Sequence, residues 1–158
     1  MTQTPFQDLI GADNNCFGCG PNNPDGLRIK SRWNEADPNE AVCVWHGKPF
    51  HSAGPPEVMN GGIIASLLDC HSICTAFADA YRTEEREIGS NPLLWYVTAS
   101  INIEYLRPTP LAEPVTVRAR VLDRAERRTK VAATLESGGE ACARAEVVAA
   151  RLRQHWNA

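Results

Sequence analysis

Hydrophobic and polar positions follow a helical period in the middle of the chain. From Gly61 to about Ala80, apolar residues recur three or four positions apart, while alanines and cysteines fill most of the remaining faces. The larger apolar residues of this segment are Ile63, Ile64, Leu67, Leu68, Ile73, Cys74 and Phe77. A helix that is apolar on nearly every side must be wrapped by other structure. The sequence therefore predicts one long buried helix here.

The segments on both sides of this helix alternate with the period of β-strands. Before it, residues 27–33 and 41–45 are predicted strands, and the turn-rich segment between them favours a hairpin. Four further strands are predicted after it, over residues 93–106, 115–122, 130–136 and 141–152. Short connections between the last strands favour antiparallel neighbours. An α+β fold explains both the order of the predicted elements and the apolarity of the helix on nearly every side. In this fold an antiparallel sheet of about six strands is wrapped around one long central helix.

Residues 1–26 differ from the rest because turn-forming residues crowd them. Asparagine, glycine and proline predominate, and the segment contains a Cys16-x-x-Cys19 turn. We predict an irregular N-terminal arm here, followed by a single domain over residues 27–158. A chain of 158 residues suits one domain with one core.

Charge and hydropathy restrict the partners and the location. The net charge is −3, with 16 basic and 19 acidic residues, so there is no broad positive field and no nucleic acid is expected. No uninterrupted apolar run approaches the roughly 20 residues that span a bilayer, so no membrane is expected either. The segment Met1–Pro5 lacks a basic start followed by an apolar stretch, and we expect a cytoplasmic protein.

The six cysteines predict packed thiols rather than a metal centre. Cys70 and Cys74 lie four apart in the apolar helix, where core packing is the expected role. Cys16 and Cys19 could form half of a zinc site, but no second C-x-x-C or spaced histidine pair exists. Only distant residues could complete such a site by folding back: His46, His51 or Cys43. We therefore expect no metal and no cofactor.

Two motifs together resemble those of the hotdog-fold acyl-CoA thioesterase superfamily, of the phenylacetate-degradation and 4-hydroxybenzoyl-CoA thioesterase type. Residues 60–62 read Asn-Gly-Gly, and Asp69 follows after six more residues, at the spacing of the family's His-Gly-Gly-x6-Asp/Glu pattern. Residues 98–108 resemble the family's long strand, which begins with Ser or Thr and ends in an aromatic-apolar-x-Pro step. The resemblance implies a hotdog fold that hydrolyses an acyl-CoA substrate to free acid and CoA.

The resemblance extends into the arm and departs at one position. Residues 16–27, from the Cys-Phe-Gly-Cys-Gly-Pro turn to Gly-Leu, are similar to an extension in a branch of these proteins. Asn60 stands where the family usually has histidine. Asparagine can cap the helix and form hydrogen bonds, but it cannot accept a proton as imidazole can. A hydrogen-bonding role is therefore expected of Asn60.

Thioester hydrolysis needs a site for negative charge on the carbonyl oxygen and a carboxylate that attacks or activates water. A helix N-terminus offers unpaired N–H groups and a positive dipole end, and glycine there allows close approach. Gly61 is thus the expected oxyanion donor, as the resemblance also implies. Asp69 is the expected catalytic carboxylate, with its pKa raised by burial and lowered by nearby donors. The resemblance makes Thr98 the residue that holds Asp69 or the water, although an ordinary strand residue remains the alternative.

The spacing along the helix predicts a shared site. Asp69 lies nine residues after Asn60, so about 13 Å further along the axis at ~1.5 Å per residue. Nine steps of about 100° also place it on roughly the opposite face. One helix cannot present both groups to one thioester, whereas two antiparallel helices can bring Gly61 of one subunit near Asp69 of the other. We predict a homodimer or a dimer of dimers, as the resemblance also implies.

Several other residues are candidates for contacts with the substrate. The phosphates of CoA favour basic groups at the pocket mouth, and the candidates are Arg107 after the long strand and Arg128 and Lys130 in a predicted turn. Solvated surface charges are the alternative for these three. Gly62 at the helix start and Ser72 on the helix are further pocket candidates.

Two other readings use different residues. Residues 51–55 superficially resemble the histidine-bearing loop of hotdog dehydratases and hydratases, but the carboxylate of those enzymes sits differently from Asp69. His71 points about 200° away from Asp69 and is expected to be structural. A non-catalytic acyl-CoA-binding module is the other alternative. It would be favoured by loss of the carboxylate or by an added DNA-binding helix pair, and neither is seen.

Overall fold

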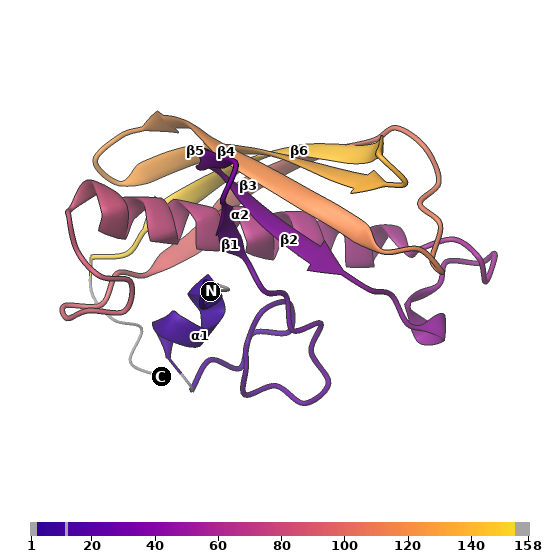
Figure 1. Ribbon diagram of the computed structural model, residues 1–158, viewed down its shortest axis with the longest axis horizontal. Coiled ribbons are helices and arrows are strands. Elements are labelled where there is room, and N and C mark those ends of the chain that lie inside the picture. Colours follow the sequence, from indigo (N-terminus) through magenta and orange to yellow (C-terminus); the bar gives the residue numbers. More distant parts are fainter. Residues whose placement is uncertain (1–2, 12, 154–158) are drawn as a thin grey trace.

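A six-stranded antiparallel sheet curves around one long helix in the computed structural model, which describes residues 3–11 and 13–153 (Figure 1). The elements are α1 (Phe6–Ile10), β1 (Arg32–Asn34), β2 (Asp37–Trp45), a 3-10 helix (Pro49–His51), α2 (Gly61–Thr83), β3 (Tyr96–Tyr105), β4 (Val115–Arg124), β5 (Arg128–Ser137) and β6 (Glu140–Arg151). The strand order is β1-β2-β4-β5-β6-β3, and all neighbours are antiparallel. The predicted fold class is confirmed.

Helix α2 begins where the sequence predicts and runs three residues past Ala80. Asn60 has an extended backbone, and its side-chain oxygen accepts hydrogen bonds from the amides of Gly62 and Ile63. These bonds satisfy two of the amides that a helix start leaves without an intrahelical acceptor. The helix ends at Thr83, where the Glu84 N–H donates to the Ala80 carbonyl.

The apolarity of α2 is explained by the sheet that covers it. By length and composition alone the helix could cross a membrane, although polar residues interrupt its apolar positions. Residues all along it are nevertheless buried, and Leu67 and Leu68 have no exposed surface. The sheet supplies the opposing side chains from alternate positions, including Val115, Val117 and Val147, which are also fully buried.

The N-terminal part of the chain departs from prediction in two places. The arm is not wholly irregular, because it contains the short helix α1, and Phe6 of that helix joins the main core. The strand predicted over residues 27–33 is wrong for most of its length, since β1 starts only at Arg32. The segment before it hydrogen-bonds to the arm instead: the Leu27 N–H donates to Phe17 O, and the Ile29 N–H donates to Gly18 O. The predicted hairpin between the first two strands is confirmed.

Strand β3 lies at one edge of the sheet and carries a bulge that re-aims its side chains. Its pairing with β6 shifts between Thr98 and Ser100. The β6 partners of Thr98 and Tyr105 are Ala149 and Ala143, which are both fully buried on the helix side. Thr98 and Tyr105 are seven residues apart, an odd number that would place them on opposite faces of a regular strand. Because the bulge adds one residue, they face the same side of the sheet. Both side chains therefore point toward α2.

Candidate active site

Asp69 on α2 is bonded to Thr98 on β3. The Thr98 hydroxyl donates to Asp69 Oδ1 at 2.6 Å. Asp69 is half-buried, and this desolvation raises the pKa of its carboxyl above the usual value, while the bond from Thr98 opposes the rise. The direction agrees with the sequence-based expectation. The helix and the edge strand thus hold one carboxylate in a fixed orientation with one oxygen already engaged.

An apolar cavity of about 280 Å³ lies beside this pair. It opens between the N-terminal arm, α2 and the start of β3, and both Asp69 and Thr98 line it. Its apolar walls are formed by Ile10, Ile73, Phe77, Trp95, Tyr96 and Val97. A carboxylate at the wall of an apolar cavity fits a substrate with a hydrocarbon or aromatic part next to a polar reacting centre.

The start of α2 forms the second part of the site. Asn60 occupies the amides of Gly62 and Ile63, so Gly62 has no free N–H to offer. The Gly61 N–H has no acceptor among the residues that the structure describes. The Tyr105 hydroxyl donates to Gly61 O at 2.8 Å and fixes this end of the helix to β3. The Gly61 amide is therefore the group available to an anionic oxygen.

Both parts of the site contact strand β3. Asp69 contacts Thr98 near one end of β3, and Gly61 contacts Tyr105 at the other. Both contacts face the same strand, but the one at Gly61 is made by its backbone carbonyl, so the opposition of Asn60 and Asp69 around the helix axis stays a prediction. The separation along the axis holds, since eight residues at ~1.5 Å each give about 12 Å. Within one chain, Gly61 and Asp69 do not converge on one carbonyl group.

The predicted basic residues lie apart from the Asp69 cavity. Arg107 follows β3 and forms an ion pair with Glu140. Arg128 and Lys130 belong to strand β5 rather than to the predicted turn. Both are exposed, whereas the intervening Thr129 is buried, so they project from the face of the sheet that is turned away from α2.

Ser72, His71 and His51 have structural surroundings. Ser72 is fully buried, does not line the cavity, and its hydroxyl finds no partner within the described part of the chain. His71 is also fully buried, with its ring nitrogens bonded to Ser31 Oγ and Ala41 O, and burial lowers its pKa to about 4. His51 Nδ1 accepts from the Lys48 N–H, and the described residues provide no carboxylate partner for His51.

The structure brings together thiols that the sequence analysis treated separately. The sulfurs of Cys16, Cys19 and Cys70 lie within 4.8 Å of one another, and Cys74 lines the same cavity. Hydrogen bonds from the neighbouring thiols, that of Cys16 first, lower the pKa of Cys19 well below its usual range. No pattern in the sequence indicates that Cys70 meets the arm. The role of Tyr105 was also missed, although it is the aromatic residue of the strand motif.

Comparison with known proteins agrees with the fold. Residues 57–144 match the Thioesterase superfamily, and the chain belongs to that superfamily. A thioesterase superfamily protein from Shewanella loihica PV-4 is 33% identical, with a TM-score of 0.62 over 78% of this chain and 90% of that one. The E. coli PaaI protein from the phenylacetic acid degradation operon shares the fold at 17% identity, with a TM-score of 0.63 over 80% of each chain.

A curated relative carries a name that describes an activity. The acyl-coenzyme A thioesterase THEM4 of Rattus norvegicus is 27% identical over 115 residues. The match covers 73% of this chain and 43% of that protein, so the chain spans less than half of that relative's length.

Proposed function

We propose that this protein hydrolyses acyl-CoA thioesters to the free acid and CoA. The observation that carries the proposal is the bonded pair of Asp69 and Thr98 on the wall of an apolar cavity. The cavity accepts the acyl group, and the pair provides the carboxylate that the reaction needs. The name of the rat relative supports an acyl-CoA substrate.

In the proposed reaction, Thr98 occupies Asp69 Oδ1 and leaves the second oxygen for chemistry. That oxygen either attacks the thioester carbonyl or takes a proton from the attacking water. The carbonyl oxygen becomes negative as the tetrahedral intermediate forms. A helix N-terminal N–H directed at that oxygen stabilises the charge, and Gly61 provides it. Asn60 contributes by capping the helix and leaving that amide free.

We further propose that the complete site forms between two copies of the chain. Gly61 and Asp69 are about 12 Å apart along one helix, so one thioester cannot contact both. Two α2 helices related by a two-fold axis can place Gly61 of one copy beside Asp69 of the other. Edge strand β3 supports this arrangement because the strand and the residue after it expose apolar side chains near the site: Val97, Ile101, Tyr105 and, after the strand, Leu106. Each dimer then contains two equivalent sites, and dimers can pair further into a tetramer.

Recognition of the CoA phosphates is assigned in this proposal to exposed basic residues. Arg107 lies two residues after Tyr105, and thus at the end of β3 that contacts the helix start. Arg128 and Lys130 lie on the outer sheet face, where they can reach only a CoA moiety that extends around the sheet. A cytoplasmic location remains the prediction made from the sequence.

The first test replaces the carboxylate. Asp69→Asn keeps the size of the side chain and an oxygen that can accept the Thr98 bond, but it cannot attack or take a proton. We expect kcat to fall about 10²- to 10⁴-fold in a screen of short, medium, long-chain and aromatic acyl-CoAs with free-thiol detection. Unchanged circular dichroism and oligomeric state are the control. A folded Asp69→Asn protein that is as fast as the parent would falsify the assignment.

The second test addresses the shared site with paired variants. Gly61 is the first helical residue after an extended Asn60, which is a position where proline fits and lacks the N–H. We expect Gly61→Pro to lower kcat about 10²- to 10³-fold. The matched control is Gly61→Ala, which retains the N–H and whose Cβ meets Tyr105 Oη at an ordinary 3.5 Å.

Mixing the two inactive variants separates the arrangements. A heterodimer of Asp69→Asn and Gly61→Pro subunits has one site with both wild-type groups if sites are shared, and none if each chain contains its own. Random re-association of equal amounts should therefore restore about a quarter of the parental activity. No recovery in demonstrated heterodimers would show that each site lies within one chain.

The alternatives predict other outcomes. A non-catalytic binding module would bind acyl-CoA tightly without turnover on any acyl chain. A dehydratase or hydratase needs histidine paired with a carboxylate. Among residues 3–11 and 13–153, the hydrogen bond seen for the His51 ring is that of Nδ1 with the Lys48 amide, and no carboxylate pairs with it. The Asp69–Thr98 geometry favours hydrolysis over both.

A further inference from the structure

Four cysteines from two distant parts of the chain meet in the wall of the cavity. Cys16 and Cys19 come from the turn of the N-terminal arm, and Cys70 and Cys74 come from consecutive turns of α2. Residues four apart lie on the same helix face, so Cys70 and Cys74 are directed at the arm together. All six cysteines of the chain are free thiols, and no disulfide links the cluster.

The spacing of the sulfurs matches that of a tetrahedral thiolate site. The sulfurs of Cys16, Cys19 and Cys70 lie within 4.8 Å of one another, and the Cys16 and Cys70 sulfurs are 3.7 Å apart. Two sulfurs bound at ~2.3 Å to one tetrahedral zinc ion lie about 3.8 Å apart. A disulfide needs a sulfur separation of about 2 Å. The cluster is therefore spaced for a shared cation rather than for a covalent bond.

The turn of the arm is built to bring its backbone against the Cys70 sulfur. A Cβ on Gly18 would lie 2.2 Å from Cys70 Sγ, so only glycine allows this approach. A Cβ on Gly20 would lie 2.4 Å from the Cys16 amide nitrogen, and the Gly20 N–H donates to Cys16 O at 2.8 Å. Both glycines of the Cys-x-Gly-Cys-Gly turn thus serve the close packing of the thiols.

We propose that Cys16, Cys19, Cys70 and Cys74 bind one zinc ion per chain. Three sulfurs are already in place, and Cys74 supplies the fourth, since it is buried, lines the same cavity and lies one helical turn after Cys70. Thiolates favour zinc, copper(I) or iron–sulfur clusters over hard cations, and a single four-sulfur site suits zinc. The ion binds the N-terminal arm to the helix residue next to Asp69 and so fixes one wall of the acyl cavity. This site is separate from the reacting groups.

The test measures metal in the purified protein and in matched cysteine variants. Inductively coupled plasma mass spectrometry of protein produced with added zinc should find about one zinc per chain. Cys16→Ser, Cys19→Ser and Cys70→Ser should each lose most of it. Cys43→Ser and Cys142→Ser are the controls, because both cysteines are buried and neither belongs to the cluster. They should keep the full content.

A second measurement on the parent protein guards against variants that fail to fold. Chelator-treated, reduced protein titrated with Co²⁺ should develop thiolate-to-cobalt absorption and intense tetrahedral visible bands that saturate at about one cobalt per chain. Zinc should then abolish these bands. The proposal would be overturned if the cobalt bands do not appear, or if a folded Cys16→Ser protein retains zinc. It would also be overturned if the protein contains copper or iron in place of zinc, or a Cys16–Cys19 disulfide and no metal.

Discussion

At the scale of single residues, Thr98 positions the carboxylate that we propose to be catalytic. Its hydroxyl is 2.6 Å from Asp69 Oδ1. We expect Thr98→Val, which keeps the shape of the side chain but cannot donate, to lower kcat about 10- to 100-fold, with a smaller effect on KM. Thr98→Ser retains the hydroxyl and should restore most of the rate. Equal rates for the Val and Ser variants in the acyl-CoA assay would make Thr98 an ordinary strand residue.

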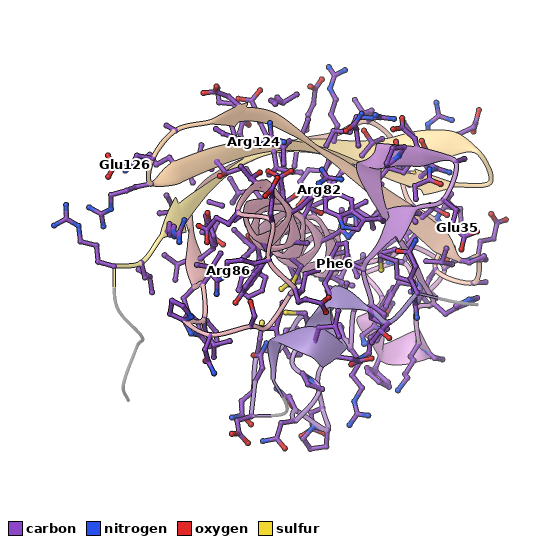
Figure 2. All side chains as sticks on the ribbon, turned by 60° about the vertical axis from the view of Figure 1, so that its left-hand side comes forward. Phe6, Glu35, Arg82, Arg86, Arg124 and Glu126 are labelled. Carbon is purple, nitrogen blue, oxygen red and sulfur yellow. The ribbon has the colours of Figure 1, made fainter. Side chains whose placement is uncertain are left out.

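At the scale of elements, an ion pair links the second half of α2 to strand β4. Asp79 is buried, and Arg124 donates to its two oxygens at 2.6 and 2.8 Å, while Arg82 donates at 3.0 Å. Figure 2 labels these two arginines. We expect Asp79→Asn to lower the free energy of unfolding by about 1–3 kcal/mol, measured by urea denaturation. Asp123→Asn, an exposed change on the same strand as Arg124, is the control and should have little effect.

The same pair predicts a dependence of stability on pH. Burial raises the pKa of Asp79, but the two arginines lower that pKa by a larger amount, so the net pKa lies below the ordinary value of 3.8. A carboxyl whose pKa is depressed in the folded state contributes its full stability at pH values above its pKa in the unfolded chain. That stability is lost as the pH falls through the pKa of the folded state. The difference between parent and Asp79→Asn should therefore be constant from pH 7 to 5 and shrink below about 3.8. A difference that persists unchanged at pH 3 contradicts the charge-based explanation.

At the scale of the whole molecule, the open edge of β3 supports the proposal that two copies of the chain assemble there. Ile101 lies on the helix side of this strand, opposite the buried Val147, yet 37% of it is exposed. We expect light scattering to find at least a dimer of the 17.3 kDa chain. Ile101→Lys should give folded monomers with little thioesterase activity, because it places a charge in the proposed interface.

The control for this change is an exposed apolar residue elsewhere on the sheet. Val44 on β2 is 58% exposed, so Val44→Lys should leave both assembly and activity unchanged. A parent protein that is monomeric and fully active, or an Ile101→Lys monomer that keeps its activity, would exclude the shared site.

The sequence by itself determined the elements whose causes are local. Three signals lie in contiguous residues: the cap at Asn60, the apolar period of α2 and the alternation of the later strands. Each of these elements could therefore be found without knowing which elements pack against it. The strand over residues 27–33 failed because alternation indicates an extended chain but not its partner, and most of this segment pairs with the arm. The motif spacing also made Asp69 and Gly61 the candidate site residues, and their roles stay predictions.

Only the tertiary structure decided which distant residues meet. Thr98 reaches Asp69 across 29 positions, and Cys16 reaches Cys70 across 54. The bulge that turns Thr98 toward the helix depends on its register with β6, and strand pairing likewise sets Lys130 on the outer face. Periodicity specifies which side of an element is apolar, whereas docking of helix, sheet and arm specifies what covers that side. For this reason the candidate carboxylate could be read from the sequence, and its partner Thr98 was expected only through the family resemblance. The bond between Thr98 and Asp69 and the meeting of the four thiols became visible only in the tertiary structure.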